Sequence, residues 1–525
     1  MQIGQTRIAG ERRTGNAGDH ERGKSQRGKR ATRDPPCHRR IVAGGVHHAG
    51  QGAGGAPRTL ACMAAGIVTE GFIDALRARL PDLRLLTDET DRESFRRDET
   101  PFIAAGLPGA VALPVDRAQV VGIVKACAEF DVPIVPRGAG SGLSGGASGI
   151  DGALTVAFTA MDRIVEIDAP NLCVVTQPGV INARLKAAVA ERGLFYAPDP
   201  ASYEMCSIGG NLGTNAGGLC CVKYGQTRDS VLSLEVVMAD GSVIRTGGKN
   251  VKDVAGYSLT HLMVGSQGTL GLITEATLRL RPTPPTRGTL LAFFPTLESA
   301  GDAVAGIAAA GLSPVTLELM DRFTIRAVDD VHALGLDRDA AAMLMIESDL
   351  PGMAADDELA RADTVCVEVG ATTTVRSQTP AEADMLRQAR RAAHFALERI
   401  GDVKMEDVGV PRSRVPDMLR AVEAIAAKHD VQIGTFGHAG DGNLHPDLVL
   451  ERGDPRAEVV TKAVQADLYR AALDLGGTVT GEHGIGSARR EWLEEQRGAD
   501  AVRVMRAIKT ALDPQGLLNP GRVLP

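Results

Sequence analysis

The sequence predicts an α+β protein in which a ligand-binding domain is followed by a second domain built around an antiparallel sheet. Three glycine-rich stretches, separated by short apolar strands, lie within residues 132–274. The run RPTPP at residues 281–285 then marks a domain boundary. Beyond it, short strands alternate with helical segments whose apolar residues recur about every 3.6 positions. This mixture is typical of α+β domains.

The first domain is assigned to residues 63–284 from its sequence of elements. An amphipathic helix (FIDALRARL) opens it after Thr69. Asp240 and Gly241 form a hairpin turn between its last two strands. Helices are predicted at 118–130 and 181–192, and strands at 153–158, 164–168, 173–177, 234–238 and 243–246.

The second domain is assigned to residues 285–512, and residues 513–525 form a separate tail. Its pattern predicts an antiparallel sheet with helices on one face. Strands are predicted at 289–294, 316–320, 342–347 and 365–369, and helices at 297–310, 381–400, 415–429, 455–475 and 499–512.

Charge separates the N-terminal stretch from the rest of the chain. Residues 1–62 carry 12 Lys/Arg and 4 Asp/Glu, a net of +8, whereas the whole chain has a net charge of −7. The overall negative charge argues against nucleic acid as a partner. The stretch has little hydrophobic periodicity and is predicted to be disordered. We expect translation to start near Met63, with a basic interaction tail as the alternative.

The eight cysteines form no CxxC pair, so the sequence lacks the common zinc-knuckle and iron–sulfur motifs. Scattered thiols favour a reducing cytoplasm. The longest uncharged run, between Asp253 and Glu275, is interrupted by glycines and polar residues, so no transmembrane segment is expected.

The first glycine-rich stretch, VPIVPRGAGSGLSGGA at residues 132–147, begins as a strand and ends as a loop. Backbone N–H groups in such a loop can bind phosphate or pyrophosphate. The loop lacks the Lys-Ser/Thr ending of a nucleoside triphosphatase and the dinucleotide fingerprint G-x-G-x-x-G. A flexible linker would explain one such loop. Two more, at 208–219 and 264–274, favour a long ligand in a groove of backbone.

Two short motifs near the C-terminus together contain three histidines. GHAGDGNLH spans Gly437–His445, and GEHGIG spans Gly481–Gly486. A turn at Asp441-Gly442 would bring His438 and His445 together, and Glu482 would supply a third ligand. Two histidines and one carboxylate with an open position are typical of a catalytic metal site. The alternative is a set of hydrogen-bonded turn or core histidines.

Together these segments resemble the FAD-linked oxidases of the vanillyl-alcohol oxidase type. The resemblance is strongest to the branch that holds D-lactate dehydrogenases, D-2-hydroxyglutarate dehydrogenases and the flavin subunit of glycolate oxidase. It covers roughly residues 70–525 in the family's order. The matching segments are PRGAGSGLSGG, PDPAS, IGGNLGTNAGG, KYGQTRD, GYSLTHLMVGSQGTLGLITE, GHAGDGNLH, GEHGIG and LDPQGLLNPGRVLP. The chain departs from the family at Ser258, Gln267 and Arg489, where Asp, Glu and Lys are usual.

The resemblance implies a two-subdomain FAD-binding domain, a substrate or cap domain, and a tail that returns to the flavin domain. The residues it assigns to FAD are Pro136, Arg137, Gly138, Ala139, Gly140, Ser141, Gly142, Pro200, Ser207, Gly210, Asn211, Gly213, Thr214, Asn215, Gly217, Gly218, Gly268, Ile273 and Asn519. Residues 137–146 contain no His or Cys, so the flavin is expected to be non-covalent. Cys206, Cys220 and Cys221, in or near the second glycine-rich stretch, leave a covalent link open.

The resemblance also implies a chemistry. A divalent metal, Zn or Mn, held by His438, His445 and Glu482, would bind the hydroxyl and carboxylate of a D-2-hydroxy acid such as D-lactate or glycolate. His483 would accept the hydroxyl proton, and hydride would pass to the flavin. Arg390, at the family's arginine position, would bind the carboxylate, with Lys404 as a weaker candidate.

Two other functions stay open at this point. The chain could be a flavin subunit that is active only within a glycolate oxidase complex, or a non-redox enzyme of the same fold that exchanges an acyl for an alkyl group. The electron acceptor, whether quinone, cytochrome, electron-transfer flavoprotein or iron–sulfur subunit, is not specified by the sequence. The expected location is the cytoplasm, with the inner face of the membrane as the alternative.

Overall fold

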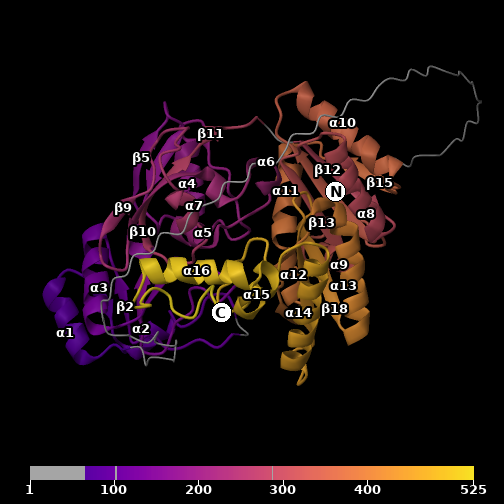
Figure 1. Cartoon of the computed structure of the whole chain (residues 1–525). Helices are drawn as coiled ribbons and strands as arrows, with labels where there is room; N and C mark the ends of the chain where they lie inside the picture. Colours follow the sequence, from indigo (N-terminus) through magenta and orange to yellow (C-terminus); the bar gives the residue numbers. More distant parts are fainter. Residues whose placement is uncertain (1–65, 101–102, 286–287) are drawn as a thin grey trace, which may run out of the picture. The chain divides into compact units, whose positions relative to one another are not determined.

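The computed structural model describes residues 66–100, 103–285 and 288–525 (Figure 1). The predicted disordered extension, residues 1–62, lies outside the described residues.

The first sheet has four strands in the order β1-β2-β4-β3. Strands β2, β4 and β3 are parallel, and β1 pairs antiparallel with β2. Its bounds are β1 (Arg84–Leu86), β2 (Ala110–Leu113), β3 (Ile134–Arg137) and β4 (Leu154–Ala157), with helices α1 (Glu70–Arg79), α2 (Glu89–Glu93) and α3 (Arg117–Phe130) around it. Helix α3 matches the predicted helix because Asp116 caps its N-terminus by accepting from Gln119 N–H, and Asp131 ends it with a φ of 57°.

The second sheet is antiparallel, in the order β5-β6-β10-β8-β9. Its strands are β5 (Ile164–Asp168), β6 (Cys173–Thr176), β8 (Val231–Val237), β9 (Val243–Arg245) and β10 (Leu272–Arg279). Each strand predicted in residues 153–246 is present within a few residues of its expected bounds. Gly241, with a φ of 80°, makes the predicted hairpin turn between β8 and β9.

The second glycine-rich stretch is not a loop throughout. Residues Ile208–Thr214 form a short helix, α5. Ser207 caps it by accepting from Gly210 N–H, and Asn215 ends it in the left-handed region. Glycine disfavours helices, so the cap and the buried Ile208 and Leu212 outweigh intrinsic propensity here. The remaining elements up to residue 282 are α4 (Asn182–Ala190), α6 (Cys221–Tyr224), α7 (Leu259–Met263), β7 (Leu194–Phe195) and β11 (Arg281–Pro282).

The third sheet lies wholly within residues 288–450, beyond the proline-rich segment. Its strands follow the order β15-β12-β14-β13-β18-β19-β16, and all their pairings are antiparallel. A short strand, β17, pairs with β19 off this path. The bounds are β12 (Gly288–Phe294), β13 (Thr316–Asp321), β14 (Ala342–Ser348), β15 (Thr373–Arg376), β16 (Asp402–Lys404), β17 (Val408–Gly409), β18 (Gln432–His438) and β19 (Asn443–Leu450).

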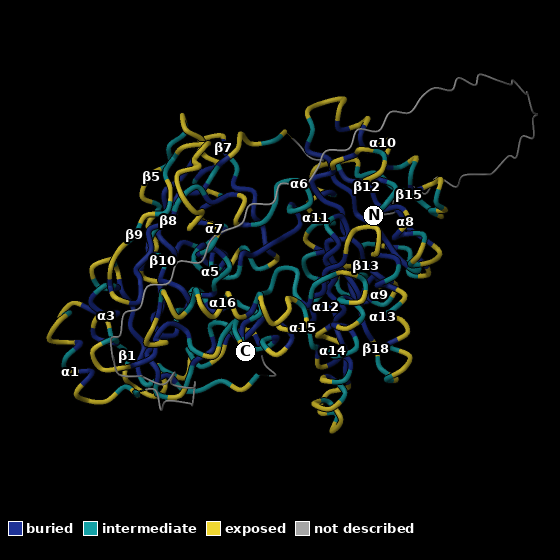
Figure 2. Tube along the Cα trace, in the orientation of Figure 1, coloured by how far each residue is buried: buried dark blue, intermediate teal, exposed yellow. Residues whose placement is uncertain are grey.

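Helices cover both faces of this sheet, which corrects the prediction of helices on one face. Along β12, Leu290 packs in one hydrophobic cluster, whereas Leu291 packs in another. The first cluster includes α8 (Leu297–Ala309), α10 (Met353–Glu368), α13 (Val415–His429) and α14 (Ala457–Asp474); the second includes α9 (Arg322–His332), α11 (Pro380–Arg391) and α12 (Ala393–Glu398). The strands are correspondingly buried, as Figure 2 shows for β12, β13 and β18.

Two further predictions are wrong. The expected strand at 365–369 is the end of α10, because Leu359, Ala362 and Cys366 continue a buried helical stripe against the sheet. The expected helix at 381–400 is two helices, α11 and α12, which meet at Ala392, where ψ is 2°.

The C-terminal residues follow α15 (Leu493–Arg497) and α16 (Ala499–Leu512) and reach the first sheet. Ile134 of β3 donates its N–H to Leu517 O at 2.8 Å and accepts from Asn519 N–H at 2.8 Å. The tail is therefore tied to the domain that carries the first glycine-rich loop, as the resemblance implies.

Candidate functional site

The turn between β18 and β19 brings two of the predicted ligands together. His438 is the last residue of β18, and His445 lies in β19 opposite Phe436. The predicted Asp441-Gly442 turn is present, and Gly442 has a φ of 82°. A Cβ at Gly437 would lie 2.5 Å from Asn443 O, so the close approach of the two strands there requires glycine.

Glu482 lies in the segment between α14 and α15. Its Oε1 lies 3.2 Å from His438 Nε2 and 3.3 Å from His445 Nε2. Donors bound tetrahedrally to zinc at about 2.0–2.1 Å would be separated by about 3.4 Å. Both imidazoles are buried, with exposures of 6% and 4%. All three donor atoms lie within 4.8 Å of one another, so they form a group that is able to hold a divalent metal.

The charges around this triad favour a cation, either a proton or a metal ion, between its three side chains. Burial lowers the pKa of His438, but Glu318 and Glu482 outweigh it and raise that pKa well above its usual value. Burial raises the pKa of Glu482, but His438 and His445 bring it well below the usual value. A cation is thus stabilised beside the buried carboxylate.

Glu318, on β13, contacts the ring nitrogen of His438 that is not directed to Glu482. Its Oε1 accepts from His438 Nδ1 at 2.8 Å, which leaves Nε2 directed to Glu482. A carboxylate behind a metal-binding histidine fixes its tautomer and raises its basicity.

Arg390, the predicted carboxylate-binding residue, lies on the other side of Glu318. Its Nη2 is 2.6 Å from Glu318 Oε2, and its guanidinium lies 4.8 Å from the centre of the Phe436 ring. The ion pair is close but not aligned for hydrogen bonding, since Arg390 Nε and Nη2 are buried without a hydrogen-bond partner. Nη2 is thus held in an ion pair with Glu318, and Nε has neither an ion-pair nor a hydrogen-bond partner.

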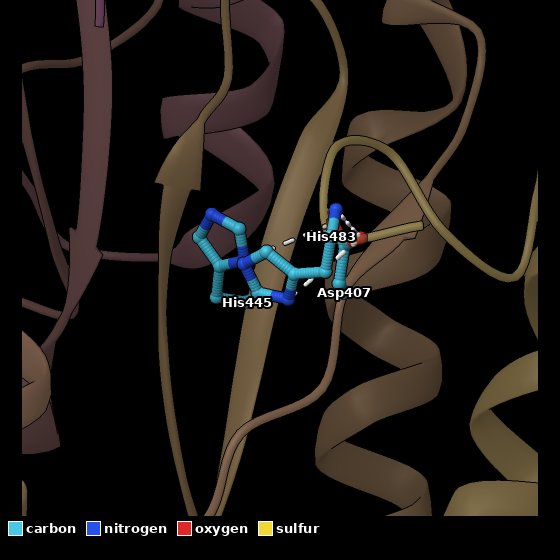
Figure 3. A group of neighbouring side chains, drawn as sticks. All are labelled: Asp407, His445 and His483. Atoms are coloured by element: carbon cyan, nitrogen blue, oxygen red, sulfur yellow. Dashed lines mark hydrogen bonds and ion pairs between the residues drawn. The ribbon is translucent and has the colours of Figure 1, made fainter. Parts of the chain in front are cut away.

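His483 lies beside the triad. Its ring stacks on that of His445 (Figure 3), with the ring centres 5.2 Å apart. Its Nε2 is 3.9 Å from Glu482 Oε1. Burial lowers the pKa of His483 to about 4, against the opposing effect of Asp407. The ring is therefore neutral near pH 7 and can accept a proton.

Asp407 anchors the segment that carries Glu482 and His483. Its Oδ2 accepts from Thr480 Oγ1 at 2.6 Å and from the N–H groups of Gly481, Glu482 and His483 at 2.9, 3.1 and 2.9 Å. Its Oδ1 accepts from Asn443 Nδ2 at 2.8 Å. Asp407, His445 and His483 also form a compact group (Figure 3). Because Asp407 already accepts five hydrogen bonds, His438, His445 and Glu482 are the group with the freer donor atoms for a metal.

A cavity of about 760 Å³ runs from the glycine-rich segments to this triad. Its lining includes His438, His445, Glu482, His483 and Arg390. This volume lies within the range of about 300–1,000 Å³ for ligand and cofactor sites. Gly213 lines the cavity, and a Cβ added there would meet no atom within 4 Å. The backbone thus leaves the space that a cofactor would fill.

The predicted cofactor residues fall into two groups. Lining the cavity are Pro136, Arg137, Gly138, Ala139, Gly140, Ser141, Gly142, Pro200, Gly210, Asn211, Gly213, Thr214, Gly268 and Ile273. Away from its lining are Ser207, Asn215, Gly217, Gly218 and Asn519. Of these, Ser207 supports the wall by accepting from Ala139 N–H, and Asn519 donates to Gly146 O and Gln267 O.

Sequence reasoning missed Glu318 and Asp407. Each is at most 1% exposed, and each comes from a segment distant in sequence from the histidines it contacts. A charged residue between leucines in TLELMD was a weak signal for Glu318. Asp407 carried no local motif.

A glycine-lined cofactor cavity that ends at a buried histidine–carboxylate group defines a flavin-type oxidoreductase site. Residues 108–247 match the family described as FAD binding domain, and residues 283–523 match FAD linked oxidases, C-terminal domain. The chain belongs to the FAD-linked oxidase family and is an FAD-binding oxidoreductase.

Relatives of known name support this assignment. The chain is 44% identical to glycolate oxidase subunit GlcD of Bacillus subtilis, over 82% of this chain and 91% of that one. It is 34% identical to a D-lactate dehydrogenase of Anaerostipes hadrus, over 87% and 98% of the two chains. The structure of p-cresol methylhydroxylase shares the fold with a TM-score of 0.72 and 18% identity, over 87% of this chain and 97% of that one.

Among the described residues, no helix is both long and apolar enough to span a bilayer.

Proposed function

We propose that this protein is an FAD-dependent dehydrogenase that oxidises a D-2-hydroxy acid, such as D-lactate or glycolate, to the 2-oxo acid with the help of a divalent metal. The observation that carries the proposal is the opening of the His438–His445–Glu482 triad into the same cavity as the glycine-rich loops. Relatives named for glycolate and D-lactate agree with this substrate class.

The residues around the cavity suit the two functional groups of such a substrate. When bound, FAD accepts a hydride equivalent, and Zn²⁺ or Mn²⁺ in the triad stabilises an alkoxide. Arg390, which lines the cavity, offers its positive charge to the carboxylate. His483, neutral because burial lowers its pKa, accepts the hydroxyl proton at its ring. Glu318 holds His438 in the tautomer that binds metal.

The test is anaerobic reduction of bound flavin by a panel of hydroxy acids. D-lactate, L-lactate, glycolate and D-2-hydroxyglutarate are each mixed with metal-loaded protein, and flavin absorbance is followed. Bleaching by D-lactate or glycolate, and not by L-lactate, is expected. If none of the acids bleaches the flavin, the redox function is wrong.

Metal-stripped protein that keeps its FAD is the matched control. It should bleach about 10²–10⁴-fold more slowly, because the alkoxide is no longer stabilised and its proton is harder to remove. Equal rates with and without metal would remove the metal from the proposal but leave hydride transfer in place.

We further propose that the enzyme passes its electrons to a partner, because the glycolate oxidase relative is named as a subunit. The candidates are a quinone, a cytochrome, an electron-transfer flavoprotein or an iron–sulfur subunit. Turnover of the purified chain with an artificial dye would show that it is active alone. Bleaching without dye turnover would favour a partner-dependent subunit.

The free cysteines among the described residues agree with a cytoplasmic location.

A further inference from the structure

A second cavity, of about 450 Å³, reaches the triad from another direction. His438 and Glu482 line both cavities, whereas His445 and His483 line only the first. Two of the three proposed metal ligands therefore form part of a wall between the two spaces.

The second cavity is lined by none of residues 136–147, the first glycine-rich loop. Its lining comes mainly from the β18–β19 turn and from residues 409–411, 476–478, 481 and 482. Gly217 and Gly218, which were expected to contact FAD, line this cavity and not the first. Asp229, Pro411, Gly476 and Arg497 also line it, and all four are exposed, so the cavity opens to solvent.

One carboxylate on its wall accepts fewer hydrogen bonds than it can. The carboxylate of Asp441 accepts one long hydrogen bond, from Asn443 N–H at 3.4 Å. Its remaining lone pairs can accept hydrogen bonds from the water shell of an ion in this cavity. Asn443, beside it, is committed to the wall, because its Nδ2 donates to Asp407 and its Oδ1 is buried.

The first cavity cannot serve as an open path in the working enzyme. Its lining combines the glycine-rich segments with Arg390 and the triad, so FAD and substrate would occupy it. The second cavity has none of the residues assigned to substrate. It has room for a hydrated divalent ion, which needs about 180 Å³ for six waters of about 30 Å³ each.

We propose that the second cavity is the route by which a hydrated divalent cation enters and leaves the metal site while FAD is bound, with the carboxylate of Asp441 holding its water shell on the way. This inference rests on the proposed metal function. The occupant is a small aquated cation because the cavity is lined by the carboxylates of Asp441 and Glu482, and carboxylate oxygens are the ligands that such ions prefer. Glu482 then takes the ion directly from the cavity that it lines.

The test measures zinc uptake by FAD-loaded protein that has been stripped of metal. Samples are desalted at intervals after Zn²⁺ addition, and bound zinc and FAD are measured per chain. Asp441→Asn should slow uptake and release by about tenfold or more, with little change in zinc bound at equilibrium, because Asp441 is not a ligand of the bound ion. Glu204→Gln, which changes an exposed carboxylate on the first cavity, should match the wild type.

A second variant tests the route by narrowing the second cavity with a larger side chain, instead of by removing a charge. Cys221 lines the second cavity and not the first. Cys221→Phe should slow uptake and release together while FAD content is unchanged.

Several results would overturn the route. Wild-type uptake rates in both Asp441→Asn and Cys221→Phe would exclude it, as would slowing by Glu204→Gln alone. Lower equilibrium zinc with faster release in Asp441→Asn would make Asp441 a ligand instead. A wild type that binds no zinc at equilibrium would refute the metal itself, which separates that failure from failure of the route.

Discussion

Glu318 Oε1 accepts from His438 Nδ1 at 2.8 Å, and its Oε2 lies 2.6 Å from Arg390 Nη2. One buried carboxylate thus links the proposed metal ligand to the proposed carboxylate-binding residue. Under the proposed function, Glu318 on strand β13 couples the residues that bind the hydroxyl and the carboxylate of the substrate.

Glu318→Gln should therefore weaken metal binding without removing a ligand. The amide can still accept from His438, but it lacks the charge that raises the basicity of the imidazole and pairs with Arg390. The dissociation constant for zinc should rise by about tenfold or more, as measured by competition with a chelator. Glu358→Gln, which alters a buried carboxylate bonded to Ser348, is the control and should leave zinc affinity unchanged. Equal affinities in all three proteins would contradict the supporting role.

His438→Ala and His483→Ala should distinguish the proposed metal ligand, His438, from the proposed general base, His483. Loss of His438 removes one of three donors, so bound metal and turnover should fall together. Loss of His483 should leave metal bound and slow flavin reduction by about 10²–10⁴-fold. Metal analysis and stopped-flow bleaching check both, with FAD content as the control. Metal loss in His483→Ala alone would reverse the two assignments.

Asp407→Asn should destabilise the protein as well as the site. Its Oδ2 accepts four hydrogen bonds from residues 480–483, and an amide group cannot accept them all. We expect the free energy of unfolding to fall by about 2–3 kcal/mol, since buried bonds to a charged acceptor are lost. Urea unfolding measures this. Asp339→Asn, at a side chain that is 98% exposed, should have almost no effect. A stability equal to the wild type would show that the loop does not depend on Asp407.

Asp321 should give stability a pH dependence of its own. Burial raises its pKa to about 6, although Thr324 and Thr435 N–H groups donate to it. Because the folded pKa lies above the unfolded value of about 3.9, the stabilisation is complete below about pH 4 and is lost as the pH rises through about 6. Asp321→Asn cannot titrate. The stability of the wild type relative to this variant should therefore increase by about 2 kcal/mol from about pH 7 to about pH 4.5, as urea unfolding can measure. A difference in unfolding free energy that stays the same from about pH 7 to about pH 4.5 would contradict the raised pKa.

The flavin should leave the protein on denaturation. Cys206 is the one cysteine among the described residues that lines the first cavity, and it exchanges hydrogen bonds with Asn211. We expect FAD in the supernatant after heat precipitation, and the same FAD content in Cys206→Ala. Flavin that stays with the precipitate, and is lost from it in Cys206→Ala, would indicate a covalent thioether.

Local sequence determined much of this molecule. Asp116 and Asp131 set the ends of α3, and Asp441-Gly442 set the turn that brings His438 and His445 together. These features depend on residues a few positions apart, so their side chains and φ preferences are sufficient to predict them. The glycine-rich segments likewise predicted a wall made of backbone.

Only the tertiary structure decided the rest. Residues 365–369 have a strand-like composition but extend α10, because Cys366 completes a stripe that the sheet buries. Leu290 and Leu291 are equally apolar, and helices arriving from later in the chain decide that both faces of β12 are covered. Glu318 and Asp407 reach their histidines from segments 120 and 76 residues away, so no short-range pattern encodes those contacts. Burial then determines how these groups ionise, because the charge of a carboxylate or imidazole depends on which partners the fold places beside it.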